Sequence, residues 1–591
     1  SGANTYTGTN VVNAGKLMLA TRTGAAPNSG DITVTDGATF GVKQGGSTLS
    51  LSVANATFGS AGATSLDIDL GNLDGNPLAA SLKVTGTLAL NGTVTVNIAD
   101  QMPAVGTVPL VQYVKPKAGT GSFVLGTLPN GVMATLTDDT ATGLVSLTVT
   151  SVSLPKWLGT TDGSTPDGTW DIGTTANWID LVTTDFTTYT DPAPVLCPDN
   201  FDPTTFTPNV TLDVTVAPST VTFNNFSDVY TLSGTGKISG SGSLLKQGSA
   251  SVTISTLNDY TGPTTVEATD DPATVEVVAV GGKLSVNTLA NGGVASAIGA
   301  SSADAANLVL KGGTLEYTGA ATTIDRGFTI AATGSGISTV NDLTLSGPVA
   351  ATGGNLVKTG AGNLILTNPG ANVFGTVNQG LRVNGGTLTL DGGVAGTQTN
   401  AVAGELWLAS APDVAANLVL INTSLATTSW FAMGRGNGAT GTVSTLTATD
   451  STVTTANFST GFWNNLPNDS DQILTLTDTI WTNNGSTLLA ESENATTTMT
   501  LVGSSVDSTV FTGTGPTRLA IGANSAVTMA LQGTAVYTGT GENLLAVGAN
   551  SAVTMTLEGT AVYNARGRFS IGLGNNSVAT VTLQDSAQLI Q

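Results

Sequence analysis

The feature that most constrains the fold of this chain is an internal repeat near its C-terminal end. The stretch 521–537, IGANSAVTMALQGTAVY, recurs as VGANSAVTMTLEGTAVY at 547–563 and in a degraded form at 571–589. Leucines mark this 26-residue step and a looser series before it; they are Leu446, Leu476, Leu501, Leu531, Leu557 and Leu583. A repeat of this length is one structural unit used several times, so it determines the fold class before any other feature.

Each copy consists of short stretches in which apolar and polar residues alternate, as at Val527 and Met529, and Gly or Asn turns separate them. Two or three short strands cannot enclose a core alone. Stacked repeats can, because each strand then pairs with the equivalent strand of the next repeat and the repeats share one core. The repeat therefore predicts an all-β chain folded as an elongated, right-handed parallel β-helix, or β-solenoid. The residues that we expect to stack inside it are Leu531, Leu557, Leu583, Tyr537 and Tyr563.

A different repeat occupies the middle of the chain. LLKQGSASVTISTLNDYTGPTTV (244–266) is similar to LVKTGAGNLILTNPGANVFGTV (356–377), and Gly-Gly-x-Leu segments begin at Gly281, Gly312 and Gly385. The phrase Leu-x-Lys-x-Gly-x-Gly-x-Leu, Asn-x-Tyr-x-Gly-x-Thr, Gly-Gly-x-Leu resembles the autotransporter-associated β-strand repeat of bacterial surface proteins. That resemblance implies a secreted, passenger-like β-helix and no particular activity. We expect the lysines of the phrase, Lys246 and Lys358, to lie on a solvated face.

The stretch 155–208 interrupts the repeats, because it concentrates three of the seven Trp residues, several Pro and the single Cys. Trp157, Trp170 and Trp178 have two interpretations: exposed rings that contact carbohydrate, or the local core of this stretch. The chain is thus expected to have four parts. They are a first solenoid segment (1–154), a Trp- and Pro-rich lateral or capping module (155–230), a second solenoid segment with autotransporter-type repeats (231–400), and a C-terminal solenoid (401–591).

The charge balance and the missing residue types exclude several classes of function. The chain has 18 basic and 40 acidic residues, a net charge of -22, so nucleic acid and anionic membranes are poor partners. Histidine is absent, which excludes Ser-His-Asp and Cys-His nucleophiles and His-ligated metals. Cys197 stands alone and is expected to be a free, buried thiol. The sequence has no run of 18 or more apolar residues, so no membrane-spanning helix is expected.

Neither a cofactor nor an enzymatic site is expected. Calcium is the one metal ion that acidic turns could hold, but neither the EF-hand spacing nor the Gly-Gly-x-Gly-x-Asp nonapeptide occurs, so solvated turn residues are the simpler interpretation. The carboxylates considered were Asp67, Asp69, Asp74, Asp138, Asp139, Asp162, Asp167 and Asp171. A β-helical polysaccharide lyase needs a base and cation on one face. Asp325, Arg326 and Glu405 are the nearest mixed charges, and they do not form such a set.

These observations predict an extracellular structural protein of a bacterial cell surface: a fibre, a sheath or an adhesin stalk. The alternatives are a carbohydrate- or cell-binding adhesin that contacts surface glycans and, more remotely, a polysaccharide lyase. The first copy of the autotransporter-type repeat, at 4–8, contains only the second half of the repeat phrase, and the last residues of the sequence are expected to form a strand. We therefore expect copies to stack head to tail with Tyr6 and Leu589 at the junction. The other explanation is that residues 1 and 591 bound a piece of a longer chain.

Overall fold

The computed structural model of this protein contains two compact units. The first comprises Ser1–Lys156, Ile179–Thr187 and Pro192–Val195, and the second Trp157–Trp178, Thr188–Asp191 and Leu196–Gln591. The structure describes residues 8–21, 30–71, 75–99, 103–129, 131–199, 206–270, 279–376, 380–435, 441–461, 469–505 and 507–591. Tyr6 and Asp74 lie outside the described residues. The division of the chain into four parts stays a prediction.

Strands of the first unit form three sheets around one apolar core. The first sheet has the order β1 (Asn10–Val12), β3 (Ile32–Val34), β6 (Ala56–Phe58), β9 (Leu88–Leu90). The second has the order β12 (Ser122–Leu125), β10 (Thr93–Ala99), β7 (Thr64–Asp69), β4 (Thr39–Lys43), β2 (Lys16–Ala20). The third has the order β13 (Val132–Asp139), β14 (Leu144–Val152), β11 (Gly106–Tyr113), β8 (Leu82–Val84), β5 (Leu51–Val53).

Most strand pairs of this unit are parallel, as the solenoid prediction requires. Alternation of residue types sets the inward face, so Leu66 and Ile68 in β7 are fully buried while Ser65 and Asp67 between and beside them are not. The exception is β14, which pairs antiparallel with both β11 and β13. A tight turn at Thr140–Gly143 allows this hairpin, whereas parallel neighbours need a whole coil between them.

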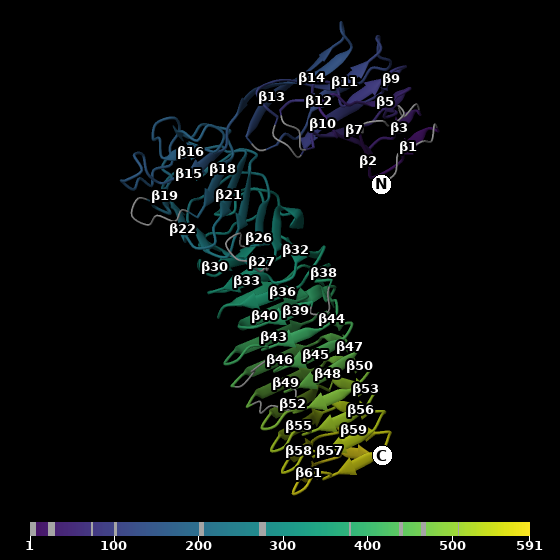
Figure 1. Ribbon diagram of the computed structural model, residues 1–591. Helices are drawn as coiled ribbons and strands as arrows, with labels where there is room; N and C mark the ends of the chain where they lie inside the picture. The colour runs from purple at the N-terminus through teal and green to yellow at the C-terminus, as the bar shows by residue number, and fades with distance from the viewer. Residues whose placement is uncertain are drawn as a thin grey trace. The chain divides into compact units, whose positions relative to one another are not determined.

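The second unit is a parallel β-solenoid (Figure 1), and from β36 (Leu356–Thr359) onward each coil contributes one strand to each of three sheets. A fifteen-stranded sheet begins at β19 (Asn209–Thr211) and ends with β54 (Thr517–Leu519), β57 (Asn543–Leu545) and β60 (Phe569–Ile571). An eleven-stranded sheet ends with β52 (Thr496–Gly503), β55 (Ala526–Gly533), β58 (Ala552–Leu557) and β61 (Val578–Leu583). A nine-stranded sheet ends with β53 (Val510–Gly513), β56 (Val536–Gly539), β59 (Val562–Ala565) and β62 (Gln588–Ile590).

The N-terminal part of this unit has a further sheet and a short hairpin. Six of its strands are, in order, β21 (Thr220–Asn224), β24 (Ser243–Gln247), β26 (Thr264–Asp270), β29 (Leu308–Lys311), β32 (Phe328–Ala332) and β35 (Val349–Ala351). Strand β27 (Ala279–Gly281) pairs antiparallel with β26. Helical structure in the described chain is confined to the short 3-10 turns Ala305–Asn307 and Gly393–Ala395. The all-β solenoid fold predicted from the repeats is therefore confirmed.

The corners between strands explain why Gly and Asn recur at fixed places. A side chain at Gly548 would lie 2.1 Å from the carbonyl oxygen of Gly522 in the preceding coil, so only glycine fits. Asn524 and Asn550 adopt φ values of 56° and 54°, a left-handed conformation that Asn tolerates better than most residues. Their side chains form an exposed ladder, since Asn550 Nδ2 donates to Asn524 Oδ1 at 3.3 Å.

The leucine columns follow the coils in register. Leu531 pairs with Leu557, and Leu557 pairs with Leu583, as Leu476 and Leu501 do further up the same sheet. Leu531 and Leu557 are fully buried, whereas Leu583 is 50% exposed.

The extrapolated start of the leucine series was wrong by two residues. Leu446 pairs with Leu474, whereas Ala448 pairs with Leu476. Strand side chains alternate with a period of two, so a slip of two residues keeps the same face inward and leaves the apolar pattern unchanged.

A column of aromatic rings runs through the nine-stranded sheet inside the second unit. Phe511, Tyr537 and Tyr563 pair in register, with ring centroids 5.0 Å and 4.8 Å apart and planes within 6° of parallel. The hydroxyl of Tyr563 donates to Asn543 Oδ1 at 3.1 Å, and burial raises the pKa of Tyr537 to about 12. The stacked rings bury large apolar surfaces while their polar ends are satisfied locally.

Lys246 and Lys358 correct the expectation of a solvated face, because both side chains are fully buried. The ammonium of Lys358 donates to the carbonyl oxygens of Thr359, Gly360 and Gly362 at 2.7, 3.1 and 3.0 Å, and to that of a glycine in the next coil at 3.1 Å. The glycine corners turn these carbonyls inward, and the lysine satisfies them. Burial lowers the pKa of Lys358 to about 8 and that of Lys246 to about 7.

Candidate functional site

The three tryptophans of the interrupting stretch pack against one another inside the second unit. The ring centroid of Trp178 lies 4.8 Å from that of Trp157 and 5.4 Å from that of Trp170, and Tyr189 lies 5.5 Å from Trp170. The indole N–H of Trp157 donates to the carbonyl oxygen of Thr207 at 2.9 Å. No more than 1% of any of the three tryptophans is exposed. Because a sugar stacks only on an accessible ring face, these residues form a local core and offer no carbohydrate contact.

The aspartates considered as calcium ligands contact other groups of the protein. Asp67 and Asp69 form ion pairs with Lys16 and Lys43, with N–O distances of 2.7 and 2.6 Å. Hydrogen bonds from nearby residues occupy the others, which are Asp138, Asp139, Asp162, Asp167 and Asp171. Across the described ranges, no three His, Cys, Asp or Glu side chains gather as a metal site would require. These carboxylates stabilise turns and join neighbouring coils.

The mixed charges considered for a lyase do not converge on one face. Arg326 is buried, and its guanidinium donates to the carbonyl oxygens of Ala290 and Gly299 at 2.8 and 2.9 Å. It therefore fixes the backbone of the upstream loop that contains Ala290 and Gly299, in the preceding coil. Glu405 belongs to a different cluster, in which Arg435 approaches its carboxylate at 3.7 Å. Asp325 accepts a hydrogen bond from the backbone N–H of Gly292 at 2.7 Å, so it holds the same upstream loop as Arg326 does.

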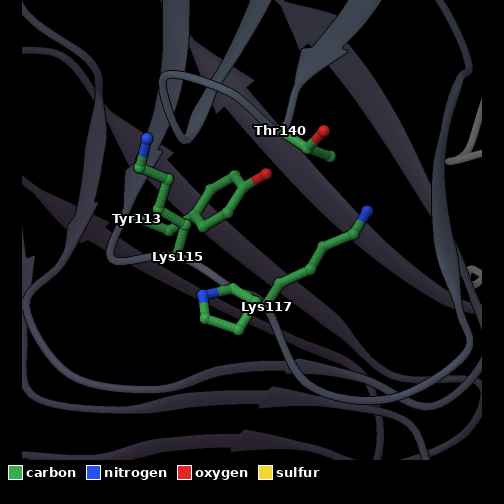
Figure 2. A pocket seen from close by; sticks show the side chains of 5 residues that line it. Tyr113, Lys115, Lys117 and Thr140 are labelled. Atoms are coloured by element: carbon green, nitrogen blue, oxygen red, sulfur yellow. The ribbon is translucent and has the colours of Figure 1, made fainter.

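A pocket of about 540 Å³ lies within the first unit, between the end of β11 and the turn after β13. Tyr113, Lys115, Lys117 and Thr140 line it together with Pro116, and the two ammonium groups point away from each other (Figure 2). The hydroxyl of Tyr113 donates to Asp138 Oδ1 at 2.8 Å, and Lys117 pairs with the other oxygen of that carboxylate. Burial makes the largest contribution to raising the pKa of Tyr113, and the hydrogen bond to Asp138 and its negative charge raise it further. Asp138 thus neutralises Lys117, while the ammonium of Lys115 donates to the carbonyl oxygen of Ala141.

A group of aromatic and charged side chains lies on the outside of the fifteen-stranded sheet; we call it the Trp407 patch. Its members are Arg382, Glu405, Trp407, Trp430 and Arg435. The guanidinium carbon of Arg382 lies 4.7 Å from the Trp407 ring centroid, and that of Arg435 lies 5.4 Å from it. Arg435 also lies 5.7 Å from the ring of Trp430. The indole N–H of Trp407 donates to Glu405 Oε2.

Three consecutive coils position this patch. Arg382 in β39 (Leu381–Val383), Trp407 in β42 (Leu406–Leu408) and Ala432 in β45 (Trp430–Met433) occupy the same register position. Their neighbours on each strand point into the core, so this position points outward. Arg382 therefore approaches Trp407 from the preceding coil, and Arg435 does so from the following one. Each contact is a cation–π interaction, worth about 0.5–2 kcal/mol.

Reasoning from the sequence identified only Glu405 of this patch. The signal that could have found it is the recurrence of LRV at 381–383 and LWL at 406–408, where the central residue of a buried–exposed–buried triplet changes from Arg to Trp. In a parallel solenoid such equivalent positions are spatial neighbours.

The residues expected at a head-to-tail junction are placed only in part. Leu589 lies in β62, pairs with Tyr563 in register and is half-buried. Because Tyr6 lies outside the described residues, the junction stays a prediction. Cys197 is free and buried, and burial raises the pKa of its thiol. Among the described residues, no helix has the length and apolar character needed to span a membrane.

The chain is similar to a bacterial surface protein over part of its length. A stretch of 159 residues, 26% of this chain, is 45% identical to the adhesin BmaC autotransporter of Brucella suis biovar 1 (strain 1330). That stretch amounts to 4% of the length of the adhesin. No protein-family model matches the chain, and no solved structure matches it. The similarity confirms the resemblance to autotransporter surface proteins that the repeat phrase indicated.

Proposed function

We propose that this chain is a β-solenoid segment of a secreted bacterial adhesin, and that its coils form a stalk which presents binding surfaces outside the cell. The similarity to an autotransporter adhesin supports the adhesive role and the location at the cell surface. The proposed role requires no catalysis, and the separation of Arg326 from Glu405 argues against the lyase alternative.

The observation that carries this proposal is the unbroken parallel pairing of the coils in the second unit. From β36 (Leu356–Thr359) to β60, each strand of the fifteen-stranded sheet pairs with its equivalent in the next coil. A solenoid of this kind is held by contacts between neighbouring coils, so its length grows with the number of coils while its cross-section does not. Such an object keeps a fixed length under load, which is what a stalk needs.

Removal of one whole coil tests this architecture. Deleting residues 527–552 joins Ala526 to Val553, which stands where Val527 stood, so every remaining strand keeps its register. We expect this variant to stay folded and resistant to protease, and the second unit to shorten by about 5 Å, one strand spacing. The matched control deletes residues 533–552, which is not a whole coil and should expose the C-terminal coils to protease. Equal protease resistance of the two variants would contradict the coil model.

The adhesive role is tested with the purified chain itself. Beads coated with the full 591-residue chain should attach to cultured animal cells, and the variant that lacks one coil should attach as well as the parent. Beads coated with heat-unfolded chain are the control for nonspecific attachment. If the native and unfolded proteins attach equally, the adhesin assignment is wrong.

A further inference from the structure

We propose that the Trp407 patch binds an acidic glycan, with the guanidinium of Arg382, held by Trp407, binding its carboxylate or sulfate group and the indole of Trp430 contacting a sugar ring. This inference rests on the proposed adhesive function and names a ligand class for it.

Arg382 is the centre of the site because part of its donor set is unused. In the part of the chain that the structure describes, its Nε atom is buried and has no hydrogen-bond partner. The guanidinium lies beside the ring of Trp407, which holds its plane but accepts no conventional hydrogen bond. A buried N–H without a partner is unfavourable, and an anionic oxygen of a ligand would satisfy it. Planar guanidinium groups bind carboxylates and sulfates through two parallel hydrogen bonds.

The local charge of the patch favours an anion although the whole chain is acidic. The patch contains two guanidinium groups, Arg382 and Arg435, against the single carboxylate of Glu405. Glu491 also lies near Arg435, but burial raises the pKa of its carboxyl group to about 7, which weakens its negative charge. Its Oε1 atom is buried without a hydrogen-bond partner among the described residues.

The aromatic rings distinguish a glycan from other anions. Trp430 lies in the coil after that of Trp407, two residues before Ala432, which is the register partner of Trp407, so its indole borders the patch beside Arg435. Indole rings pack against the apolar C–H faces of sugars while hydroxyl groups reach the flanking polar atoms. Nucleic acid is disfavoured, because a chain of net charge -22 repels a long polyanion. A glycan with separated acidic groups suffers this repulsion less.

Calorimetric titration of the full chain with three hexasaccharides tests the site. The probes are a heparin hexasaccharide, which carries sulfates and carboxylates, a hyaluronan hexasaccharide, which carries carboxylates only, and neutral maltohexaose. We expect at least one acidic probe to bind and maltohexaose not to bind. Binding of heparin alone assigns the site to sulfate, and binding of both acidic probes assigns it to carboxylate.

Variants of two arginines on the same sheet provide the matched comparison. Arg382→Gln should weaken the acidic probe at least tenfold, and Arg382→Lys should weaken it less because the charge remains. Arg518 occupies the same outward position three coils beyond Ala432 and is ion-paired with Glu542 at 3.8 Å. Arg518→Gln should therefore change the affinity less than twofold. Thermal unfolding of each variant establishes that the fold is unchanged.

Several results would overturn the inference. They are the absence of binding by both acidic probes, equal losses for Arg382→Gln and Arg518→Gln, or maltohexaose binding as tightly as the acidic probes. Competition by a hexaglutamate peptide or a 12-nucleotide DNA at equal affinity would assign the site to anions in general and contradict a glycan ligand. If coated beads attach to cells but no acidic probe binds, only this inference fails. If the beads do not attach, the proposed adhesive function fails, whatever the titration gives.

Discussion

Truncation of Leu557 to alanine is the sharpest test of the stacked core. Its side chain is fully buried, and it lies in register between Leu531 and Leu583. Removing a buried leucine side chain beyond its Cβ costs the free energy of apolar transfer and that of the cavity, together about 2–5 kcal/mol. The last coil is partly exposed and can move toward the cavity, which limits the cost. We therefore expect a loss of local stability of about 2–3 kcal/mol.

Hydrogen exchange measures this loss where it occurs. Solenoid stability is a sum of coil and interface contributions, so a single melting temperature of the chain would dilute the effect. A loss of 2–3 kcal/mol should accelerate amide exchange in β58 by about 30- to 150-fold, since each 1.4 kcal/mol corresponds to tenfold. Amides of β4 in the first unit should exchange at the parent rate.

Leu583→Ala is the matched control, because it removes the same atoms from the same column. Leu583 is 50% exposed, so much of its apolar surface is already in water. Its truncation should cost about 1 kcal/mol or less. If Leu557→Ala and Leu583→Ala accelerate exchange equally, or if β58 is unaffected by the first, the inward stacking of Leu557 is refuted.

Three further predictions concern other buried groups. Lys358 has a folded pKa of about 8 against an ordinary 10.5, so the unfolded chain binds more protons between these values. The stability that this group contributes therefore rises with pH across that window, by on the order of 2–3 kcal/mol. Lys358→Met should lack this rise when urea unfolding is compared at pH 7.5 and 10.5, and the same change in unfolding free energy for variant and parent would disprove the burial. Trp178→Ala should destabilise the aromatic core by about 3–5 kcal/mol in urea unfolding and leave acidic-glycan affinity unchanged, whereas a selective loss of affinity would return these tryptophans to a binding role. Cys197 should react with a thiol reagent only after denaturation, and rapid labelling of the native protein would contradict its burial.

The coil architecture and the columns inside it were predictable from the sequence. Near-identical copies at 521–537 and 547–563 place Leu531 over Leu557 and Tyr537 over Tyr563, because parallel in-register pairing converts a sequence period into a spatial neighbour. The same rule failed at Leu446, where the copies have diverged. A slip of two residues preserves alternation, so only the hydrogen-bonded register distinguishes Leu446 from Ala448 as the partner of Leu476.

Burial of polar and aromatic groups was decided by the tertiary structure. A lysine in a weakly charged chain is ordinarily solvated, and no local pattern reveals that glycine corners of two successive coils turn four carbonyl oxygens toward Lys358. The sequence left Trp178 with two interpretations, and its contacts with Trp157, Trp170 and Tyr189 decided between them.

The candidate site depends on the same distinction. Its residues come from segments as far apart as Arg382 and Arg435, and nothing in the spacing of charges along the chain marks them as neighbours. The sequence determined that coils would stack and which positions would be apolar, because period and alternation are local properties of the chain. Only the tertiary structure decided which outward side chains meet, because the length of each loop sets the register between coils, and that register brings Arg382 and Arg435 to Trp407.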